Sequence, residues 1–348
     1  MSNSITPLSE VGLFGLIDRY EKKFSPKHKT TLVGLENDAA VIGTDTTSFV
    51  TGQILLLEGI HFDLTYFPLK HLGYKSVISA ISEIIASGCQ PTQIGMALGL
   101  SAKMSLEAVD LLMDGVKLAC DKYDVDLITF KPSSSLTGLT LSVTAYGINK
   151  EGKTLSRAGA QENDILCVTG DLGSAFMGLQ LLEREKKVLK ETGESTPDFG
   201  SYDYLLERQL KPEARIELLN QLKEAKVEPT SMILIRESLA ATLMRLCKTS
   251  KVGCTIYENK IPIDHATSSI CEEMDFNPLM AALNGGEDYE ILFSLSLEDY
   301  KKVEEARNKL NNVFVIGYIC PESKGYSLET NAGQEIPLKT RGWGKKND

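Results

Sequence analysis

The sequence predicts an α/β protein with two domains, each built on a mixed sheet that is covered by helices on one side. Short apolar runs typical of buried strands alternate with segments of helical period, which is the pattern of layered α/β folds. A chain of 348 residues is also long enough to bury two separate cores. We therefore expect an N-terminal domain at residues 1–150 and a C-terminal domain at residues 151–348.

The first half of the chain shows this alternation most clearly. An apolar run at 53–57 predicts a strand, and from His71 apolar residues recur at helical spacing opposite a small polar face that carries Glu83. Ser105 is a good N-cap for a helix to about residue 121, and 125–128 reads as the next strand. Strict alternation over 139–145 predicts a half-exposed strand that closes the first domain.

The second half follows the same pattern with one interruption. Residues 170–178 read as a strand, a tight turn and a helix start, and the glycines there fit neither a Walker nor a dinucleotide fingerprint. Residues 183–204 are charged and predict an exposed excursion. Strands are expected at 291–295 and 313–318, with a helix ending near residue 310 between them.

Composition narrows the function classes. A net charge of -10 and the lack of a basic patch argue against a nucleic-acid partner. No apolar run approaches the ~20 residues of a membrane span, and the first residues lack the features of a signal peptide, so a cytoplasmic protein is expected. The seven scattered cysteines form no CxxC pair, which favours reduced, buried thiols over zinc or disulfides.

Several motifs occur in a recognisable order along the chain: Leu57-Glu58-Gly59-Ile60-His61-Phe62, Gly73-Tyr74-Lys75-Ser76, Ser87-Gly88-Cys89-Gln90-Pro91 and Asn284-Gly285-Gly286-Glu287-Asp288-Tyr289-Glu290. In order and spacing they resemble thiamine-monophosphate kinase, a family in the superfamily of aminoimidazole-ribotide synthetase and selenophosphate synthetase. The resemblance implies the two-domain fold of that superfamily, ATP and magnesium as cofactors, and a homodimer formed through the sheets of the first domains.

The resemblance also implies site residues. His61, Glu287 and Trp343 match positions that bind the substrate, with Trp343 as an aromatic that stacks on the substrate ring, and Arg157 matches an arginine that contacts nucleotide phosphate. Asp38, Glu83 and Glu237 match magnesium-binding acids. Each has a simpler interpretation as a turn residue, a solvated helix carboxylate, a surface ion pair or a packing anchor.

Most of the family's magnesium-binding aspartates are absent from this chain. Asn37, Ile54, Lys131 and Leu234 stand at four of those positions, and Arg236 stands where the family has a serine on phosphate. We therefore expect a degenerate magnesium site, in which Lys131 and Arg236 take the space of the metal and neutralise the remaining acids.

Two functions follow from these substitutions. The first is a weakly active or inactive kinase homologue that binds a small phosphate ligand, either thiamine phosphate or a nucleotide. The alternative is an active ATP-dependent thiamine-phosphate kinase with a reduced metal site. A third possibility, another branch of the superfamily, is disfavoured: the reactive cysteine and lysine of selenophosphate synthetase and the terminal cysteine of the hydrogenase-maturation branch have no counterparts here.

Overall fold

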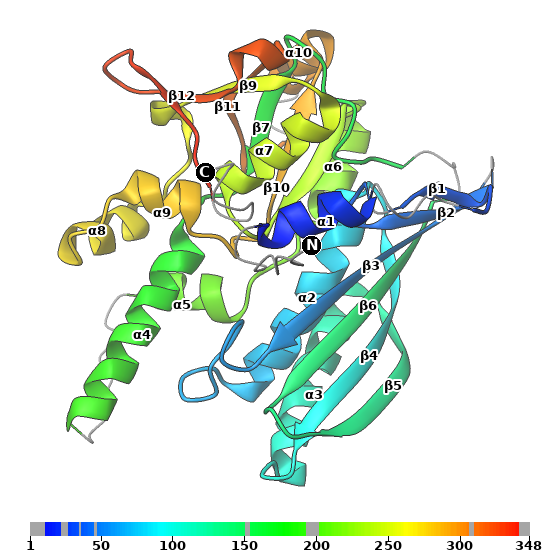
Figure 1. Ribbon diagram of the computed structural model, residues 1–348, viewed down its shortest axis with the longest axis vertical. Helices are drawn as coiled ribbons and strands as arrows, with labels where there is room; N and C mark the ends of the chain where they lie inside the picture. The colour runs from blue at the N-terminus through cyan, green and yellow to red at the C-terminus, as the bar shows by residue number, and fades with distance from the viewer. Residues whose placement is uncertain are drawn as a thin grey trace, which may run out of the picture.

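The computed structural model describes residues 11–21, 27–34, 36–44, 47–149, 154–192, 202–305 and 310–340. It contains two sheets, one in each half of the chain, which lie one above the other in Figure 1. Both sheets are mixed, so the predicted two-sheet α/β architecture is confirmed. The predicted boundary at residue 150 falls outside the described residues, between the last strand of the first sheet and the first strand of the second.

The N-terminal sheet has six strands in the order β1-β2-β3-β6-β4-β5. Only β4 and β5 run parallel; the other neighbours are antiparallel. The bounds are β1 Thr31–Val33, β2 Ala40–Thr44, β3 Thr47–Leu57, β4 Pro91–Ser101, β5 Asp126–Ser135 and β6 Thr140–Asn149.

Two helices, α2 (Leu69–Ala86) and α3 (Leu106–Tyr123), cover one face of this sheet (Figure 1). Every residue of α2 from Leu72 to Ala86 is buried, because the helix packs on β3 and β6 on one side and on α3 and the C-terminal domain elsewhere. Ser105 caps α3 by accepting a hydrogen bond from the backbone N–H of Ala108, as the sequence predicts.

The C-terminal sheet has seven strands in the order β13-β12-β9-β11-β7-β10-β8, and only β12 and β9 are parallel. The bounds are β7 Ile165–Thr169, β8 Ser231–Ile235, β9 Gly253–Tyr257, β10 Glu290–Leu295, β11 Val313–Cys320, β12 Tyr326–Glu329 and β13 Glu335–Pro337. The strands β7, β8 and β10 are buried almost throughout and form the centre of the second core.

The other helices belong mainly to the second half of the chain. Their bounds are α1 Gly12–Glu21, α4 Ser174–Thr192, α5 Asp203–Leu210, α6 Glu217–Ala225, α7 Leu239–Ser250, α8 His265–Glu273, α9 Pro278–Asn284 and α10 Leu297–Glu305, with short 3-10 turns at Glu258–Lys260 and Glu322–Lys324. The N-terminal helix α1 packs against α7 through Phe14, and α4 extends away from the body of the molecule in Figure 1.

Two segments differ from the prediction in their secondary structure. Residues 183–204 were expected to form an exposed excursion; residues 183–192 belong to the helix α4, and residues 193–201 lie outside the described residues. The strand expected at 125–128 is longer than predicted, because β5 runs from Asp126 to Ser135. It passes through Pro132, which an edge strand tolerates because one side of its backbone needs no ladder hydrogen bond.

All seven cysteines lie among the described residues and are unpaired and buried, as predicted. Among the residues that the structure describes, no helix is both long and apolar enough to cross a membrane.

Candidate functional site at the seam between the domains

The helix α2 lies along the seam between the two domains and presents three polar side chains to the C-terminal domain. Lys75, Ser79 and Glu83 are spaced four residues apart and therefore follow one face of the helix. All three are buried. The Ser79 hydroxyl lies 2.7 Å from the hydroxyl of Tyr289, and the two charged groups make their contacts at either end of the face.

Lys75 is a buried cation held by two hydrogen bonds and two aromatic rings. Its ammonium donates to the Gln209 carbonyl oxygen and to the Glu287 carboxylate, each at 2.7 Å. The rings of Phe67 and Tyr289 flank it at 5.4 and 5.9 Å. Only 2% of the Lys75 side chain is exposed, so this ion pair fixes the position of Glu287 relative to the first domain.

The predicted substrate residues His61 and Glu287 line one pocket. It has a volume of about 250 Å³ and is also lined by residues that include Asp63, Tyr66, Phe176, Glu183, Lys186 and Gly286. Burial is the main cause that lowers the pKa of His61, and its Nδ1 accepts a hydrogen bond from the Leu57 backbone N–H. These two facts favour a neutral ring that carries its proton on Nε2, and Nε2 has no hydrogen-bond partner among the described residues.

The electrostatics of Glu287 keep it ionised. Burial alone would raise its pKa, but the Lys75 ammonium and hydrogen bonds from Lys75 and Gln209 lower it below the ordinary value of 4.5. A carboxylate therefore faces a pocket that also contains the rings of Tyr66 and Phe176. This combination suits an organic ligand with a cationic or hydrogen-bond-donating ring.

The turn that carries Glu287 is tightly constrained. Gly286 has a φ of +98°, and a Cβ there would overlap the carbonyl oxygen of Glu237. Glu287 and Tyr289 also adopt positive φ values, of +60° and +55°, which non-glycine residues seldom do. The Glu287 backbone N–H donates to the Arg236 carbonyl oxygen, so this turn and the Arg236-Glu237 segment share one wall.

Arg236 lies between two of the predicted metal-binding acids. It directly follows β8, two residues before the α7 N-cap Ser238, and donates from Nη1 to Glu83 and from Nη2 to Glu237, each at 3.1 Å. The Glu83 side chain is 7% exposed and the Arg236 side chain 37% exposed. The guanidinium therefore joins a buried carboxylate of the first domain to a partly exposed carboxylate of the second.

Two further arginines hold the third acid, Asp38. Arg157 donates to the Asp38 carboxylate at 3.1 Å, and Arg245 of α7 is hydrogen-bonded to the same oxygen. Arg245 also lies 3.6 Å from Glu237. The three acids and three arginines thus form one connected cluster, which we call the arginine–carboxylate cluster: Asp38, Glu83, Glu237, Arg157, Arg236 and Arg245.

Burial separates the pKa values of the acids in this cluster. For Asp38, burial would raise the pKa, but Arg245 and Arg157 lower it below its ordinary value. For Glu83, burial dominates and raises the pKa to about 8, because the attraction of Arg236 is opposed by the charges of Asp38 and Glu237. Its Oε2 atom is buried, has no hydrogen-bond partner among the described residues, and lies against Gly52 of β3.

A magnesium ion requires several oxygen ligands that converge at about 2 Å. Here each of the three carboxylates instead accepts hydrogen bonds from a guanidinium. Across the described ranges, no group of three His, Cys, Asp or Glu side chains converges closely enough to hold a metal. The side chains in this arrangement do not fit a magnesium cage.

The substituted metal positions have new structural roles. The Asn37 amide accepts a hydrogen bond from the backbone N–H of Arg157. Ile54 is buried on the helix-covered face of the first sheet, and Leu234 packs against Ala86 and Tyr289. Apolar packing and an amide hydrogen bond therefore stand at three positions for which the sequence resemblance implies carboxylates.

Lys131 does not lie in this cluster. Lys131 of β5 pairs with Ala97 of β4, Ala97 pairs with Ser142 of β6, and Ser142 pairs with Leu55 of β3. Residues paired across neighbouring strands project to the same face of a sheet, and Leu55 lies on the exposed face, away from α2. Glu83 lies on the opposite, helix-covered face, beside Gly52. The expectation that Lys131 of the same chain enters the metal space is therefore wrong, because β5 directs it to the other side of the sheet. Trp343 lies outside the described residues.

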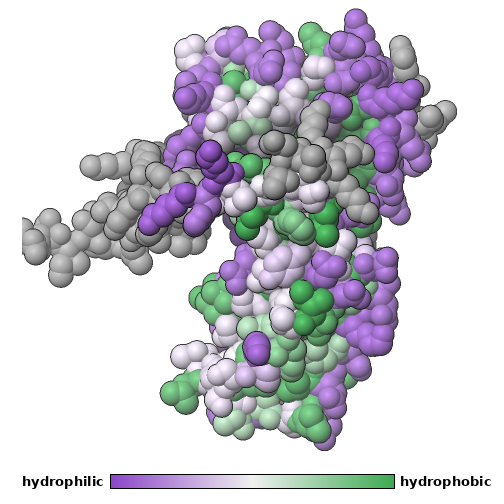
Figure 2. All heavy atoms as spheres, turned by 90° about the vertical axis from the view of Figure 1, so that its right-hand side faces the viewer, coloured by the Kyte–Doolittle hydropathy of each residue, from purple (hydrophilic) through white to green (hydrophobic). Residues whose placement is uncertain are grey.

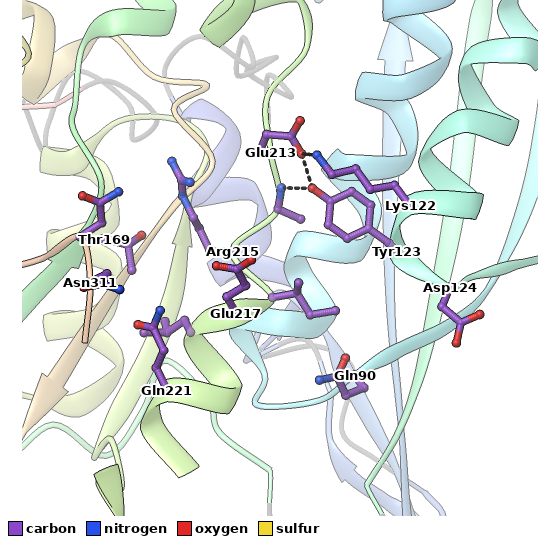
Figure 3. A pocket seen from close by; sticks show the side chains of 14 residues that line it. Gln90, Lys122, Tyr123, Asp124, Thr169, Glu213, Arg215, Glu217, Gln221 and Asn311 are labelled. Atoms are coloured by element: carbon purple, nitrogen blue, oxygen red, sulfur yellow. Dashed lines mark hydrogen bonds and ion pairs between the residues drawn. The ribbon is translucent and has the colours of Figure 1, made fainter. Parts of the chain in front are cut away.

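A larger cavity of about 550 Å³ lies elsewhere between the domains (Figure 3). Across it, Glu213 accepts a hydrogen bond from Lys122 at 2.6 Å, and the Ala214 backbone N–H donates to the Tyr123 hydroxyl at 3.0 Å. Arg215, also in its wall, forms an ion pair with the fully buried Glu290. These contacts connect the two domains, so we interpret this cavity as part of the structural seam.

Comparison with known proteins places the fold and the site in context. Residues 36–149 match the family described as AIR synthase related protein, N-terminal domain. The chain is 30% identical to the thiamine-monophosphate kinase of Buchnera aphidicola subsp. Schizaphis graminum, over 95% of this chain and 98% of the relative. The protein belongs to the thiamine-monophosphate kinase family.

Other members of the family agree with this assignment. The thiamine-monophosphate kinase of Aquifex aeolicus is 29% identical over 89% of this chain and 96% of its own length. The solved structure of AaThiL complexed with AMPPCP and TMP is similar with a TM-score of 0.79 and 27% identity, and the match covers 98% of this chain and 99% of that one. The predicted resemblance is confirmed along nearly the whole chain.

Two residues of the site were missed in the sequence. Lys75 stands in a quoted motif, and its spacing of four and eight residues from Ser79 and Glu83 could have placed it on the seam. Arg245 has no such signal, because an arginine within an amphipathic helix is usually solvated. Only the packing of α7 beside the turn at Asp38 brings it to the acids.

Proposed function

We propose that this member of the thiamine-monophosphate kinase family binds thiamine phosphate and has little or no phosphotransfer activity. The observation that supports the proposal is the arginine–carboxylate cluster, in which guanidinium groups pair with the acids that a kinase of this family would use for magnesium. The substrate-side pocket with His61 and Glu287 remains formed. A ligand site thus persists beside a metal site whose acids are already neutralised.

Phosphoryl transfer depends on positioning and on neutralising charge at the transferred group, and magnesium supplies much of that neutralisation. Losing one electrostatic stabiliser often lowers turnover ~10²-fold or more. The chain has replaced four metal-binding acids, at Asn37, Ile54, Lys131 and Leu234, so turnover should fall by orders of magnitude. The fold is kept because Ile54 and Leu234 are well packed in the core.

An active ATP-dependent kinase with a reduced metal complement is the alternative. It is favoured by the proximity of Asp38, Glu83 and Glu237, which are joined through the same arginines and could be released if those arginines moved. In that case Arg157 would contact the nucleotide phosphate, as its position in the family implies. ATP and magnesium would then both be required.

A homodimer formed through the first domains is part of the proposal. The sheet face away from α2, which we call the outer face, exposes Ile42, Phe49, Leu55 and Tyr146 by 37 to 53%. Figure 2 shows apolar atoms gathered over the lower, N-terminal half of the face turned to the viewer, while the upper half is mostly hydrophilic. A second copy of the chain would cover this apolar surface.

The test is a turnover measurement with purified protein, ATP, thiamine monophosphate and excess magnesium, which follows the formation of thiamine diphosphate. The thiamine-monophosphate kinase of Bacillus subtilis, a relative with 28% identity, is assayed in parallel as the active control. We expect a rate at least ~10²-fold below the control. A rate within tenfold of the control would favour the alternative and defeat the proposal.

A further inference from the structure

We propose that Arg236 binds the phosphate of the ligand directly, in place of a metal ion, so that binding of a phosphate monoester requires no divalent cation. This inference rests on the proposed function, because it assumes that a phosphate ligand enters the same site.

Accessibility distinguishes Arg236 from the other two arginines of the cluster. Arg157 and Arg245 have side chains that are only 7% and 9% exposed, and both are committed to Asp38. The ring of Phe14 from α1 also covers the Arg245 guanidinium, with its centroid 4.8 Å away. Arg236 is 37% exposed, so it is the guanidinium of the cluster that a ligand from solvent can reach.

The hydrogen-bonding capacity of Arg236 is only partly used. A guanidinium has five N–H donors in a planar fork, which matches the oxygens of a phosphate group. In the described part of the chain, its side-chain hydrogen bonds go to Glu83 from Nη1 and to Glu237 from Nη2. These two carboxylates hold the fork in place from both sides, while its other N–H groups are left for an oxyanion.

The main chain of Arg236 adjoins the substrate-side pocket, while the Arg236 side chain lies outside its lining, beside Glu83 and Glu237. The pocket is lined by Gly286 and Glu287, and this turn is bonded to the Arg236 main chain through the Glu287 N–H. Burial is the main cause that lowers the pKa of His61 in this pocket, and the positive charge of Arg236 lowers that pKa further. A ligand with its organic ring between His61 and Glu287 would therefore extend its phosphate toward Arg236.

These positions define the ligand as a phosphate monoester with a cationic or donor-bearing organic ring. Glu287 and the aromatic rings would receive the ring, and Arg236 would receive the phosphate. Thiamine monophosphate has both parts, whereas thiamine lacks the phosphate and inorganic phosphate lacks the ring. The three compounds thus separate the contributions of the two ends.

The experiment is calorimetric titration of the full-length protein with each of these three compounds, in excess EDTA and in excess magnesium. We expect thiamine monophosphate to bind with the same affinity, within about twofold, in both buffers. Arg236→Met should weaken this affinity about 10- to 100-fold, the loss typical of a charge-assisted hydrogen bond, and should leave the affinity for thiamine unchanged. Arg236→Lys, which keeps the charge but not the fork, should give an intermediate loss.

Lys117→Met is the matched control, because Lys117 is a cation on the exposed side of α3 that pairs only with its helix neighbour Asp121 among its described contacts. It should bind all three compounds as the wild-type protein does. Circular dichroism and the two Arg236 variants together separate a folding defect from a lost contact.

Two results would overturn the inference: thiamine monophosphate that binds only when magnesium is present, or an Arg236→Met variant, correctly folded, that binds it as tightly as wild type. The proposed function fails separately, through turnover at the rate of an active family member in the assay above. Weak turnover together with unchanged affinity in Arg236→Met would remove the inference and leave the proposed function intact.

Discussion

Replacing Lys75 with Met is the substitution whose effect on stability follows most directly from the structure. Lys75 is 2% exposed and pairs across the domain seam with Glu287, whose side chain is 28% exposed. Methionine keeps the length and the apolar packing against Phe67 and Tyr289, so the change removes mainly the charge and the hydrogen bonds. It leaves Glu287 in a low-dielectric site without its cation.

Breaking a buried ion pair from one side costs ~3–5 kcal/mol, because the remaining charge stays buried and uncompensated. Since Glu287 retains some contact with water, we expect a loss at the lower end, about 3 kcal/mol, in the free energy of unfolding at pH 7. Urea unfolding, followed by circular dichroism at constant protein concentration, measures this loss. Lys122→Met is the matched control, because the Lys122–Glu213 pair also joins the domains but its side chains are 49% and 31% exposed. It should cost less than ~1 kcal/mol.

The pH dependence gives a second check on the same substitution. In the wild-type protein, Lys75 helps to hold the pKa of Glu287 below 4.5, so the pair contributes stability above that pH and loses it as pH falls through the lowered value. In Lys75→Met, the unpaired Glu287 is relieved by protonation, so the difference between variant and wild type should shrink toward acid pH. A loss under 1 kcal/mol at pH 7, or a loss that is constant down to pH 4, would refute this reasoning.

Three other changes test separate parts of the structure. Gly286→Ala should lower the free energy of unfolding by more than 1 kcal/mol in urea titrations and weaken thiamine monophosphate binding, because a Cβ overlaps the Glu237 carbonyl; wild-type behaviour would contradict the positive φ. Leu55→Glu should convert the proposed dimer to a monomer in light scattering, whereas Leu118→Glu, on the exposed side of α3, should not; equal masses for both would reject the outer face as the interface. Arg236→Ser should create a measurable Mn²⁺ site by uncovering the acids beside it, and a variant as indifferent to Mn²⁺ as wild type would count against the idea that Arg236 excludes the metal.

The fold could be predicted because the spacing of apolar residues along the sequence carries most of the information about secondary structure. The helix of α3 and its cap follow from Ser105 and the apolar spacing after it, and the strands β3 and β6 follow from apolar runs and alternation. The end of α4 could not be placed, because a charged exposed helix and a charged loop have similar composition. The continuation of β5 past Pro132 depends on its edge position, which is a property of the sheet and not of the segment.

The site was predictable only where sequence neighbours are also spatial neighbours. Arg236 stands next to Glu237 in the chain and in the cluster, so its pairing with an acid was a natural hypothesis. The face on which Lys131 lies is set by strand register, and the pairing of β4 with β5 shifts by one residue after Ile94, where Ile128 of β5 is left without a partner in the β4 register. A one-residue shift moves a side chain to the other face of a sheet, and the segment itself does not encode that shift.

The central claim is that guanidinium groups, and not a divalent ion, occupy the carboxyl oxygens of Asp38, Glu83 and Glu237. Electron paramagnetic resonance of the wild-type protein titrated with Mn²⁺, in the presence of ATP and thiamine monophosphate, tests it most directly. The mixture with protein should bind no more Mn²⁺ than the same concentrations of ATP and thiamine monophosphate without protein. A saturable site of one or more Mn²⁺ per chain, lost when Glu83 is changed to Gln, would show that the acids still bind metal.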